Sequence, residues 1–169
     1  MTQAGASGVA HKFGDDINTD YIIAGKYTKT LDYDSLAAHL FEDIDPEFIA
    51  KVRPGDFIVA GSNFGCGSSR EQAPIAIKHA GIAAVLAKSF ARIFFRNAVN
   101  IGLPVIVCDT DRIAQGDRLR LSLQTNELTN LQTGEQIATE PLPVVMVDIL
   151  QAGGLVPYLK QRGGFVARR

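Results

Sequence analysis

The sequence of 169 residues contains few cysteines and almost no net charge. Its two cysteines, Cys66 and Cys108, are too few for a disulfide framework. They are also too few to hold an iron–sulfur cluster or a structural zinc without other ligands. The net charge is −1, whereas proteins that bind nucleic acids or membrane surfaces need a basic footprint, so we expect neither partner.

Long apolar runs are also missing, since no segment approaches the roughly 20 apolar residues that span a bilayer. The first 16 residues, MTQAGASGVAHKFGDD, lack the basic stretch and apolar run of a secretory signal. We therefore expect a cytoplasmic protein. A hydrophobic share of 46% and a charged share of 21% are typical of globular proteins, and the length favours a single domain over residues 1–169.

Short apolar runs alternate with helical patterns in the centre of the chain, which predicts an α/β fold. In chain order the elements are strand 56–61, a helix ending near Gly81, strand 82–87, a helix over 89–102 and strand 103–108. This succession predicts parallel strands joined by right-handed crossovers. On the second helix, one apolar face is expected from Phe90, Ile93, Phe94, Ala98 and Ile101.

The residue patterns at the two ends of the chain differ from those in the centre. From residue 116, apolar and polar side chains alternate, which predicts antiparallel strands with a hairpin tip at Thr133–Glu135. Residues 147–160 predict two short helices separated by glycines and Pro157. Near the front, a helix is expected over 34–42, capped by Asp32 or Asp34, after an irregular loop over 18–30 with an apolar centre.

A glycine- and serine-rich stretch, GSNFGCGSSREQ at residues 61–72, follows the first of these strands. It fits neither the P-loop, which needs a lysine after the last glycine, nor the dinucleotide-binding spacing, nor the nucleophile elbow. One interpretation is a capping box in which Ser68 and Glu71 satisfy each other's backbone amides. Pro74 conflicts with this interpretation, because it would fall in the second helical turn and remove a hydrogen bond.

The alternative interpretation of this stretch is an anion site. A helix N-terminus carries partial positive charge, and the planar guanidinium of Arg70 suits a carboxylate. Beside these groups, the hydroxyl of Ser68 or Ser69 could accept a proton. The two interpretations use the same geometry, so spacing alone leaves both open.

The stretch GSSRE and the following KSFARIF, within residues 61–106, resemble the small subunits of 3-isopropylmalate dehydratase and their relatives homoaconitase and the swivelling domain of aconitase. DDINTDYIIAGKY at 15–27, VRPGDFIVAG at 52–61 and ILQAGGLVPYLK at 149–160 extend the resemblance over most of the chain. The resemblance implies a swivelling β/β/α domain with parallel central strands and an antiparallel section.

The resemblance also implies a hydro-lyase that interconverts 2-isopropylmalate and 3-isopropylmalate by dehydration and rehydration, as in leucine biosynthesis. In this family a large partner subunit carries a 4Fe-4S cluster, and the small subunit, in a heterodimer or larger assembly, binds no metal and is inactive alone. By position, Ser68 matches the serine that removes the proton from carbon. Ser69 and Arg70 match residues that hold a substrate carboxylate.

In the front loop, Asp20 matches an acidic active-site residue of the family. The alternative interpretation is that Asp20 stabilises a turn by a hydrogen bond to its own backbone. The stretch KYTKT at 26–30 places Thr28 and Lys29 at expected substrate-binding positions. Homoaconitase-type subunits carry an arginine where Lys29 stands, so a further substrate carboxylate is possible there, although an exposed lysine is the commoner case. The hydroxy-dicarboxylate could then be isopropylmalate, which we favour, homoaconitate, or a methylated malate such as 2,3-dimethylmalate.

Other residues carry weaker expectations. His11, His39 and His79 are scattered, and each is expected on a surface or a helix face rather than as a ligand. Arg92 and Arg96, one helical turn apart, are expected on a solvated face, with contact to a partner subunit as the alternative. A rival from another class is a non-catalytic regulatory module that binds an anionic metabolite.

Overall fold

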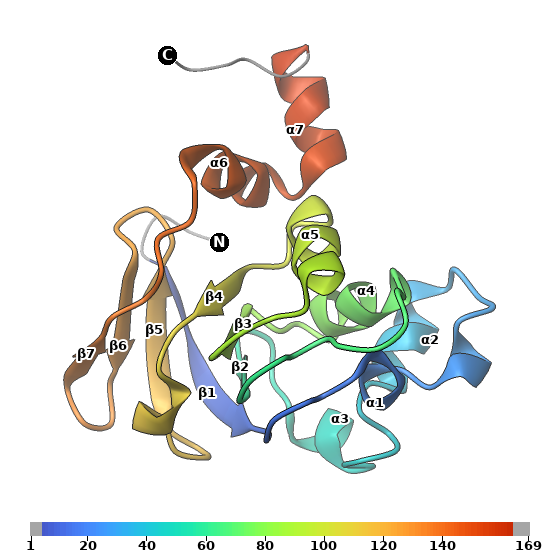
Figure 1. Cartoon of the computed structure of the whole chain (residues 1–169), viewed down its shortest axis with the longest axis horizontal. Coiled ribbons are helices and arrows are strands. Elements are labelled where there is room, and N and C mark those ends of the chain that lie inside the picture. The colour runs from blue at the N-terminus through green and yellow to red at the C-terminus, as the bar shows by residue number, and fades with distance from the viewer. Residues whose placement is uncertain (1–4, 164–169) are drawn as a thin grey trace.

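Seven strands form one mixed sheet in the computed structural model, which describes residues 5–163 (Figure 1). The sheet order is β4-β3-β2-β1-β5-β6-β7. The strands are β1 (Ala6–Lys12), β2 (Phe57–Val59), β3 (Ala84–Ala87), β4 (Val105–Val107), β5 (Arg118–Ser122), β6 (Glu127–Asn130) and β7 (Glu135–Ile137). The helices are α1 (Thr19–Ile22), α2 (Tyr33–Ala38), α3 (Phe48–Lys51), α4 (Gln72–His79), α5 (Arg92–Asn100), α6 (Val144–Ala152) and α7 (Leu155–Arg162), with 3₁₀ turns at Gly25–Tyr27 and Thr110–Arg112.

The first four strands of the sheet order are parallel, which confirms the prediction for the centre of the chain. Phe57 of β2 lies between Ala10 of β1 and Ala84 of β3. Every residue of β2 and β3 is buried, as expected for parallel strands covered on both faces. Helix α4 connects β2 to β3, and helix α5 connects β3 to β4 (Figure 1).

Strands β5, β6 and β7 form the antiparallel section that the alternating pattern predicts. Their buried apolar residues are Leu119, Leu121, Leu128 and Ile137. After β7 the chain returns to the opposite edge of the sheet, where Cys108 and Thr139 form an antiparallel bridge. The sheet is therefore curled, and the fold is the mixed α/β type that the resemblance implies.

The sequence analysis missed strand β1 and helix α3. β1 joins the two halves of the sheet, because it pairs in parallel with β2 and antiparallel with β5. Its sequence, ASGVAHK, contains one branched apolar residue and a glycine, which gives no strand signal. α3 is a single turn, too short for a periodic pattern.

Helix boundaries differ from prediction at two prolines. α4 begins at Gln72, so Pro74 is its third residue and lies in the first turn, where its missing amide removes no helical bond. Pro157 is likewise the third residue of α7 and does not interrupt it. The tail does form two helices, and Gly153, with φ of 92°, ends the first of them in the left-handed region.

The capping box expected at Ser68 is wrong, since the residue before α4 is Glu71 and no side chain caps this helix. The expected apolar face of α5 is wrong at Ile93, whose side chain is 53% exposed. At the front, Asp32 caps α2 by accepting bonds from the amides of Asp34 and Ser35, but the helix ends at Ala38. Residues 18–30 are less irregular than expected, because they contain α1 and a 3₁₀ turn.

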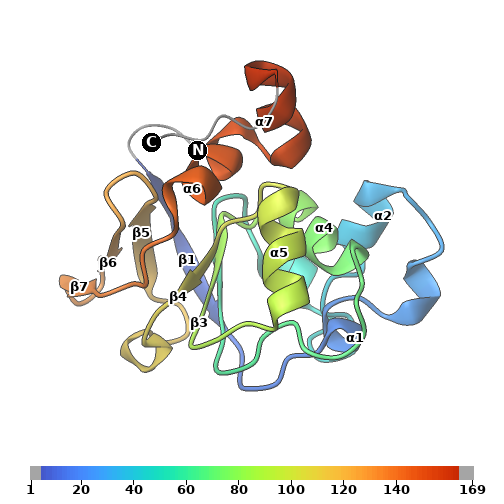
Figure 2. The same cartoon turned by 45° about the horizontal axis from the view of Figure 1, so that its top comes forward.

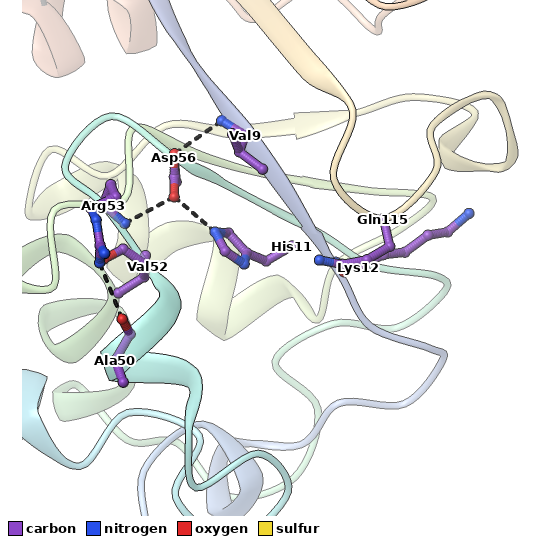
Figure 3. A network of polar contacts seen from close by, with 8 residues as sticks. All are labelled: Val9, His11, Lys12, Ala50, Val52, Arg53, Asp56 and Gln115. Atoms are coloured by element: carbon purple, nitrogen blue, oxygen red, sulfur yellow. Dashed lines mark hydrogen bonds and ion pairs between the residues drawn. The ribbon is translucent and has the colours of Figure 1, made fainter.

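A buried carboxylate ties β1 to the start of β2 (Figure 3). Asp56 Oδ1 accepts a bond of 2.9 Å from the amide of Val9, and Oδ2 accepts bonds from the Arg53 amide at 2.9 Å and from His11 Nε2 at 2.8 Å. His11 is thus a buried strand residue and not the surface or helix-face histidine that we expected. Burial raises the pKa of Asp56, but the three donors outweigh it and hold the pKa below its usual value.

The other two histidines lie at helix ends. His39 follows α2 and stacks on Tyr27, with ring centroids 3.8 Å apart. His79 is the last residue of α4 and packs against Tyr33.

Within residues 5–163, no helix combines the length and apolar character that a membrane crossing requires.

Candidate active site

The glycine-rich loop connects β2 to α4 and lies directly on helix α5. Gly65 has φ of 82°, a conformation that favours glycine, and a Cβ at this position would lie 2.2 Å from Phe94 Cγ. The loop backbone can therefore approach the helix more closely than any other residue would permit. This close approach places the serines that follow Gly65 beside the first turn of α5.

The front segment, residues 18–30, is bonded to the same loop. Thr19 donates its amide to the Cys66 carbonyl at 2.9 Å and its hydroxyl to the Ser68 carbonyl at 2.8 Å. Farther along, Gln72 Nε2 donates to the Thr28 carbonyl at 3.2 Å. Ile22 and Ile23, in the apolar centre of the segment, are fully buried, so the segment is anchored to the core as well as to the loop.

Arg70 and Asp20 form an ion pair between these two segments. The distance from Arg70 Nη2 to Asp20 Oδ1 is 2.6 Å. The Arg70 side chain is only 22% exposed, whereas that of Asp20 is 59% exposed, so the guanidinium lies on the inner side of the pair. Arg70 Nε is buried and has no hydrogen-bond partner within residues 5–163. A buried charged donor without a partner is costly, and it indicates a position where an anion could bind.

A pocket of about 330 Å³ opens between the glycine-rich loop and α5. Ser68 and Ser69 line it and are exposed, so both hydroxyls are accessible from solvent. The other lining side chains near them come from the loop, the front segment and α5: Thr19, Arg70, Arg92, Ile93, Phe94 and Asn97. The pocket therefore combines three hydroxyls, two guanidinium groups, an amide and an apolar wall.

The structure brings together four of the six residues that the sequence assigns to the site. Ser68, Ser69 and Arg70 line the pocket, and Asp20 reaches it through Arg70. Thr28 and Lys29 do not line the pocket. The Thr28 hydroxyl donates to the Gly25 carbonyl at 2.7 Å, and the Lys29 side chain is exposed, so their substrate-binding roles stay predictions.

Sequence reasoning missed the contribution of α5. Arg92, expected on a solvated face, lines the pocket, as do Ile93 and Asn97. The KSFARIF stretch carries the family resemblance, but the sequence analysis assigned none of its side chains to the site. Only the contact of Gly65 with Phe94 shows that this helix forms one wall.

Cys66 also lies in the loop, but its thiol is a weak nucleophile. Burial, helped by the nearby Asp16 carboxylate, raises the pKa of Cys66, so little thiolate forms at neutral pH. Elsewhere in residues 5–163, no three His, Cys, Asp or Glu side chains come together as a metal-binding group.

Comparison with known families links this site to a defined domain. The family model described as the aconitase C-terminal domain matches residues 15–110, which contain the front segment, the glycine-rich loop and α5. This match covers more than half of the chain. The chain belongs to the aconitase C-terminal domain family.

Relatives within the family match nearly the whole chain. The 3-isopropylmalate dehydratase small subunit 2 of Archaeoglobus fulgidus is 55% identical over 92% of this chain and 95% of its own length. The methanogen homoaconitase small subunit of Methanothermobacter thermautotrophicus is 53% identical over 88% of each chain. The crystal structure of a 3-isopropylmalate dehydratase from Methanocaldococcus jannaschii superimposes with a TM-score of 0.90 at 53% identity, covering 94% of this chain and 95% of that one. These matches confirm the resemblance and the fold.

Proposed function

We propose that this chain is the small subunit of a two-subunit hydro-lyase that interconverts 2-isopropylmalate and 3-isopropylmalate. The observation that carries the proposal is the pocket in which Ser68 and Ser69 lie beside Arg70. Relatives named 3-isopropylmalate dehydratase small subunit match about nine-tenths of the chain that forms this pocket. The relatives' names also support a larger partner subunit, without which we expect no turnover.

Ser68 is the proton acceptor in this proposal. Its Oγ takes the proton from a substrate carbon, and the electron pair of the broken C–H bond forms the double bond as the neighbouring C–O bond breaks. The departing hydroxyl leaves as water because it takes a second proton from an acidic group of the large subunit. Return of the proton and of water to the opposite carbons completes the isomerisation. A serine hydroxyl becomes basic enough only where nearby positive charge favours its ionised form, and Arg70 and Arg92 line the same pocket.

Arg70 binds a substrate carboxylate. Its guanidinium presents a planar fork that matches a carboxylate, and Asp20 fixes the orientation of that fork through the pair at 2.6 Å. The Arg70 side chain is 22% exposed and lines the pocket, so part of it is within reach of a bound carboxylate. The Ser69 hydroxyl, which lines the same pocket, donates a second hydrogen bond to the substrate.

The 4Fe-4S cluster of this proposal belongs to the large subunit. When bound, the cluster supplies a Lewis acid that polarises the substrate hydroxyl. The contribution of this chain is limited to the base, the carboxylate contacts and an apolar wall. We further propose that the complex works in the cytoplasm, and its recovery in a membrane or exported fraction would contradict this part.

Isopropylmalate is the substrate that the pocket supports best. Ile93 offers an apolar side chain for the isopropyl group, whereas Lys29, the cation expected to favour an additional carboxylate, does not line the pocket. Homoaconitate is the second candidate, because a homoaconitase small subunit is 53% identical to this chain. Dimethylmalate or methylmalate remains the third alternative.

Anaerobic reconstitution with the large subunit tests the proposal. Isopropylmalate, homoaconitate and dimethylmalate are compared by the absorbance of the unsaturated acid. Ser68→Ala should lower kcat at least about 100-fold, as expected for loss of a general base, while the complex still forms. Ser62→Ala is the matched control, because Ser62 is exposed in the same loop outside the pocket. Full turnover by Ser68→Ala would remove Ser68 from the mechanism.

Arg70→Lys separates binding from chemistry. Lysine keeps the charge but cannot make the forked contact, so we expect KM to rise about tenfold with a smaller change in kcat. An unchanged KM would contradict the carboxylate-binding role. If the wild-type chain binds an anionic metabolite but supports no turnover with any partner, the non-catalytic module becomes the better description.

A further inference from the structure

Helices α5 and α6 lie next to each other (Figure 2), and residues of both line a second, larger hollow. We call it the α5–α6 groove, and its volume is about 600 Å³. Its apolar lining comes from both helices and from the turn before α5: Phe90, Phe95, Val99, Val145, Met146 and Ile149. Aromatic residues and methionine are typical of the buried centre of protein interfaces.

Two unpaired cations line this apolar surface. Arg92 and Arg96 project from α5 into the lining, and neither forms an ion pair with any acidic side chain within residues 5–163. Lys88, also in the lining, is already paired with Asp111 at 2.8 Å. Glu140 is the acidic residue of the groove. The groove therefore offers apolar area together with unneutralised positive charge.

Arg92 also lines the Ser68 pocket, so the two hollows share a wall. Any partner that brings a reactive metal to the Ser68 pocket must lie close to Arg92 and hence to the groove. Ile93 lies next to Arg92, and its 53% exposed side chain extends the apolar surface toward the pocket. The groove and the pocket therefore lie within the footprint of one partner.

We propose that the α5–α6 groove is a docking surface for the large subunit, which inserts a segment with apolar side chains and at least one carboxylate. The inference rests on the proposed function. Charge complementarity favours this occupant over two others. A second copy docked through the same groove would bring four arginines, two from each copy, together with only two Glu140 side chains to offset them. The chain's own end carries Arg168 and Arg169, which the cations of the groove would repel.

Adjacent valines provide a matched pair of variants. Val145 lines the groove, whereas Val144 is 65% exposed and lines a different hollow with Ile106 and Leu123. Both occupy the first turn of α6, where a carboxylate is favourable, so Val145→Asp and Val144→Asp should both fold. We expect Val145→Asp to raise the Kd for the large subunit at least about tenfold, because it places a carboxylate in the apolar contact.

Arg96→Gln tests the charge separately and leaves Arg92, which lines the Ser68 pocket, in place. The dependence of Kd on salt concentration should become shallower, because one attractive charge is lost. At saturating large subunit, turnover should equal that of the wild type, since Arg96 does not line the pocket. A role in folding alone would change the melting temperature and leave the salt dependence unchanged.

The outcomes distinguish the inference from the function on which it rests. If the wild-type chain neither assembles with the large subunit nor supports turnover, the proposed function fails. If the wild type assembles and turns over but Val145→Asp binds as tightly as Val144→Asp, only the docking surface is overturned. A Val145→Asp variant that changes self-association in sedimentation, without changing affinity for the large subunit, also overturns it in favour of a second copy.

Discussion

Replacing Gly25 with alanine would move the Arg70 guanidinium without removing it. A Cβ on Gly25 would lie 3.0 Å from Arg70 Nη1 and 3.3 Å from Nη2. Favourable contacts of carbon begin near about 3.5 Å, so the guanidinium must shift by about half an ångström. Gly25 is not among the glycines with positive φ, so the variant adds no backbone strain. The perturbation is therefore confined to the position of the fork.

The expected size of the effect follows from that shift. Misplacement of a reacting or binding group by about 1 Å can cost about 100-fold in rate, so half of that displacement should cost about tenfold in kcat/KM. This corresponds to about 1.4 kcal/mol of transition-state stabilisation. Most of the loss should appear in KM, because the proposed role of Arg70 is to bind a carboxylate and not to transfer the proton.

The assay is the reconstituted isomerase with isopropylmalate, compared with a Gly14→Ala control. A Cβ on Gly14 would meet no atom within 4 Å, and its φ is not positive, so this variant should behave like the wild type. Equal kcat/KM for the two alanine variants would refute the view that the position of Arg70 determines substrate affinity. A lower melting temperature for Gly25→Ala alone would indicate a structural role instead.

Two further predictions concern buried groups. Asp56→Ala should lower the free energy of unfolding by about 3 kcal/mol in urea titrations, because three donors lose their acceptor. Since the folded-state pKa of Asp56 is lowered, its stabilisation is present above the unfolded pKa and should be lost as pH falls below about 4. Asp56→Asn should lose less stability over the same pH range, because its side chain does not titrate. Burial raises the pKa of Cys108 to about 12 and also raises that of Cys66, so both thiols should react with iodoacetamide far more slowly at pH 8 than after unfolding. Rapid labelling of folded protein would contradict this.

The sequence predicts the central strands and the antiparallel section well, because their signals are local. Buried strands such as β2 and β3 read as short apolar runs, and β5 reads as strict alternation. β1 has no such signal, since its place in the sheet depends on pairing with strands far along the chain. The prediction for His11 failed for the same reason: its partner Asp56 lies 45 residues away.

The same difference between local and long-range signals applies to the residues of the candidate site. Ser68, Ser69, Arg70 and Asp20 could be assigned because contiguous motifs carry them, whereas the role of Arg92 depends on how the loop packs on α5. The capping box failed because Pro74 is tolerated only in the first turn, which moves the start of the helix to Gln72. The serines are thereby left in the loop beside the pocket instead of satisfying helix amides.

The electrostatics of the pocket follow from how its two arginines are partnered. Asp20, 2.6 Å from Arg70, fixes the fork but also offsets much of its charge. Arg92 has no acidic partner within residues 5–163, so its part of the positive field in the pocket is not offset by a neighbouring carboxylate. In the proposed mechanism, Arg70 would therefore provide a carboxylate contact of fixed geometry, and Arg92 would provide charge that favours an ionised serine. A large subunit that places a carboxylate against Arg92 would weaken that field, so its acidic contact in the α5–α6 groove should fall on Arg96.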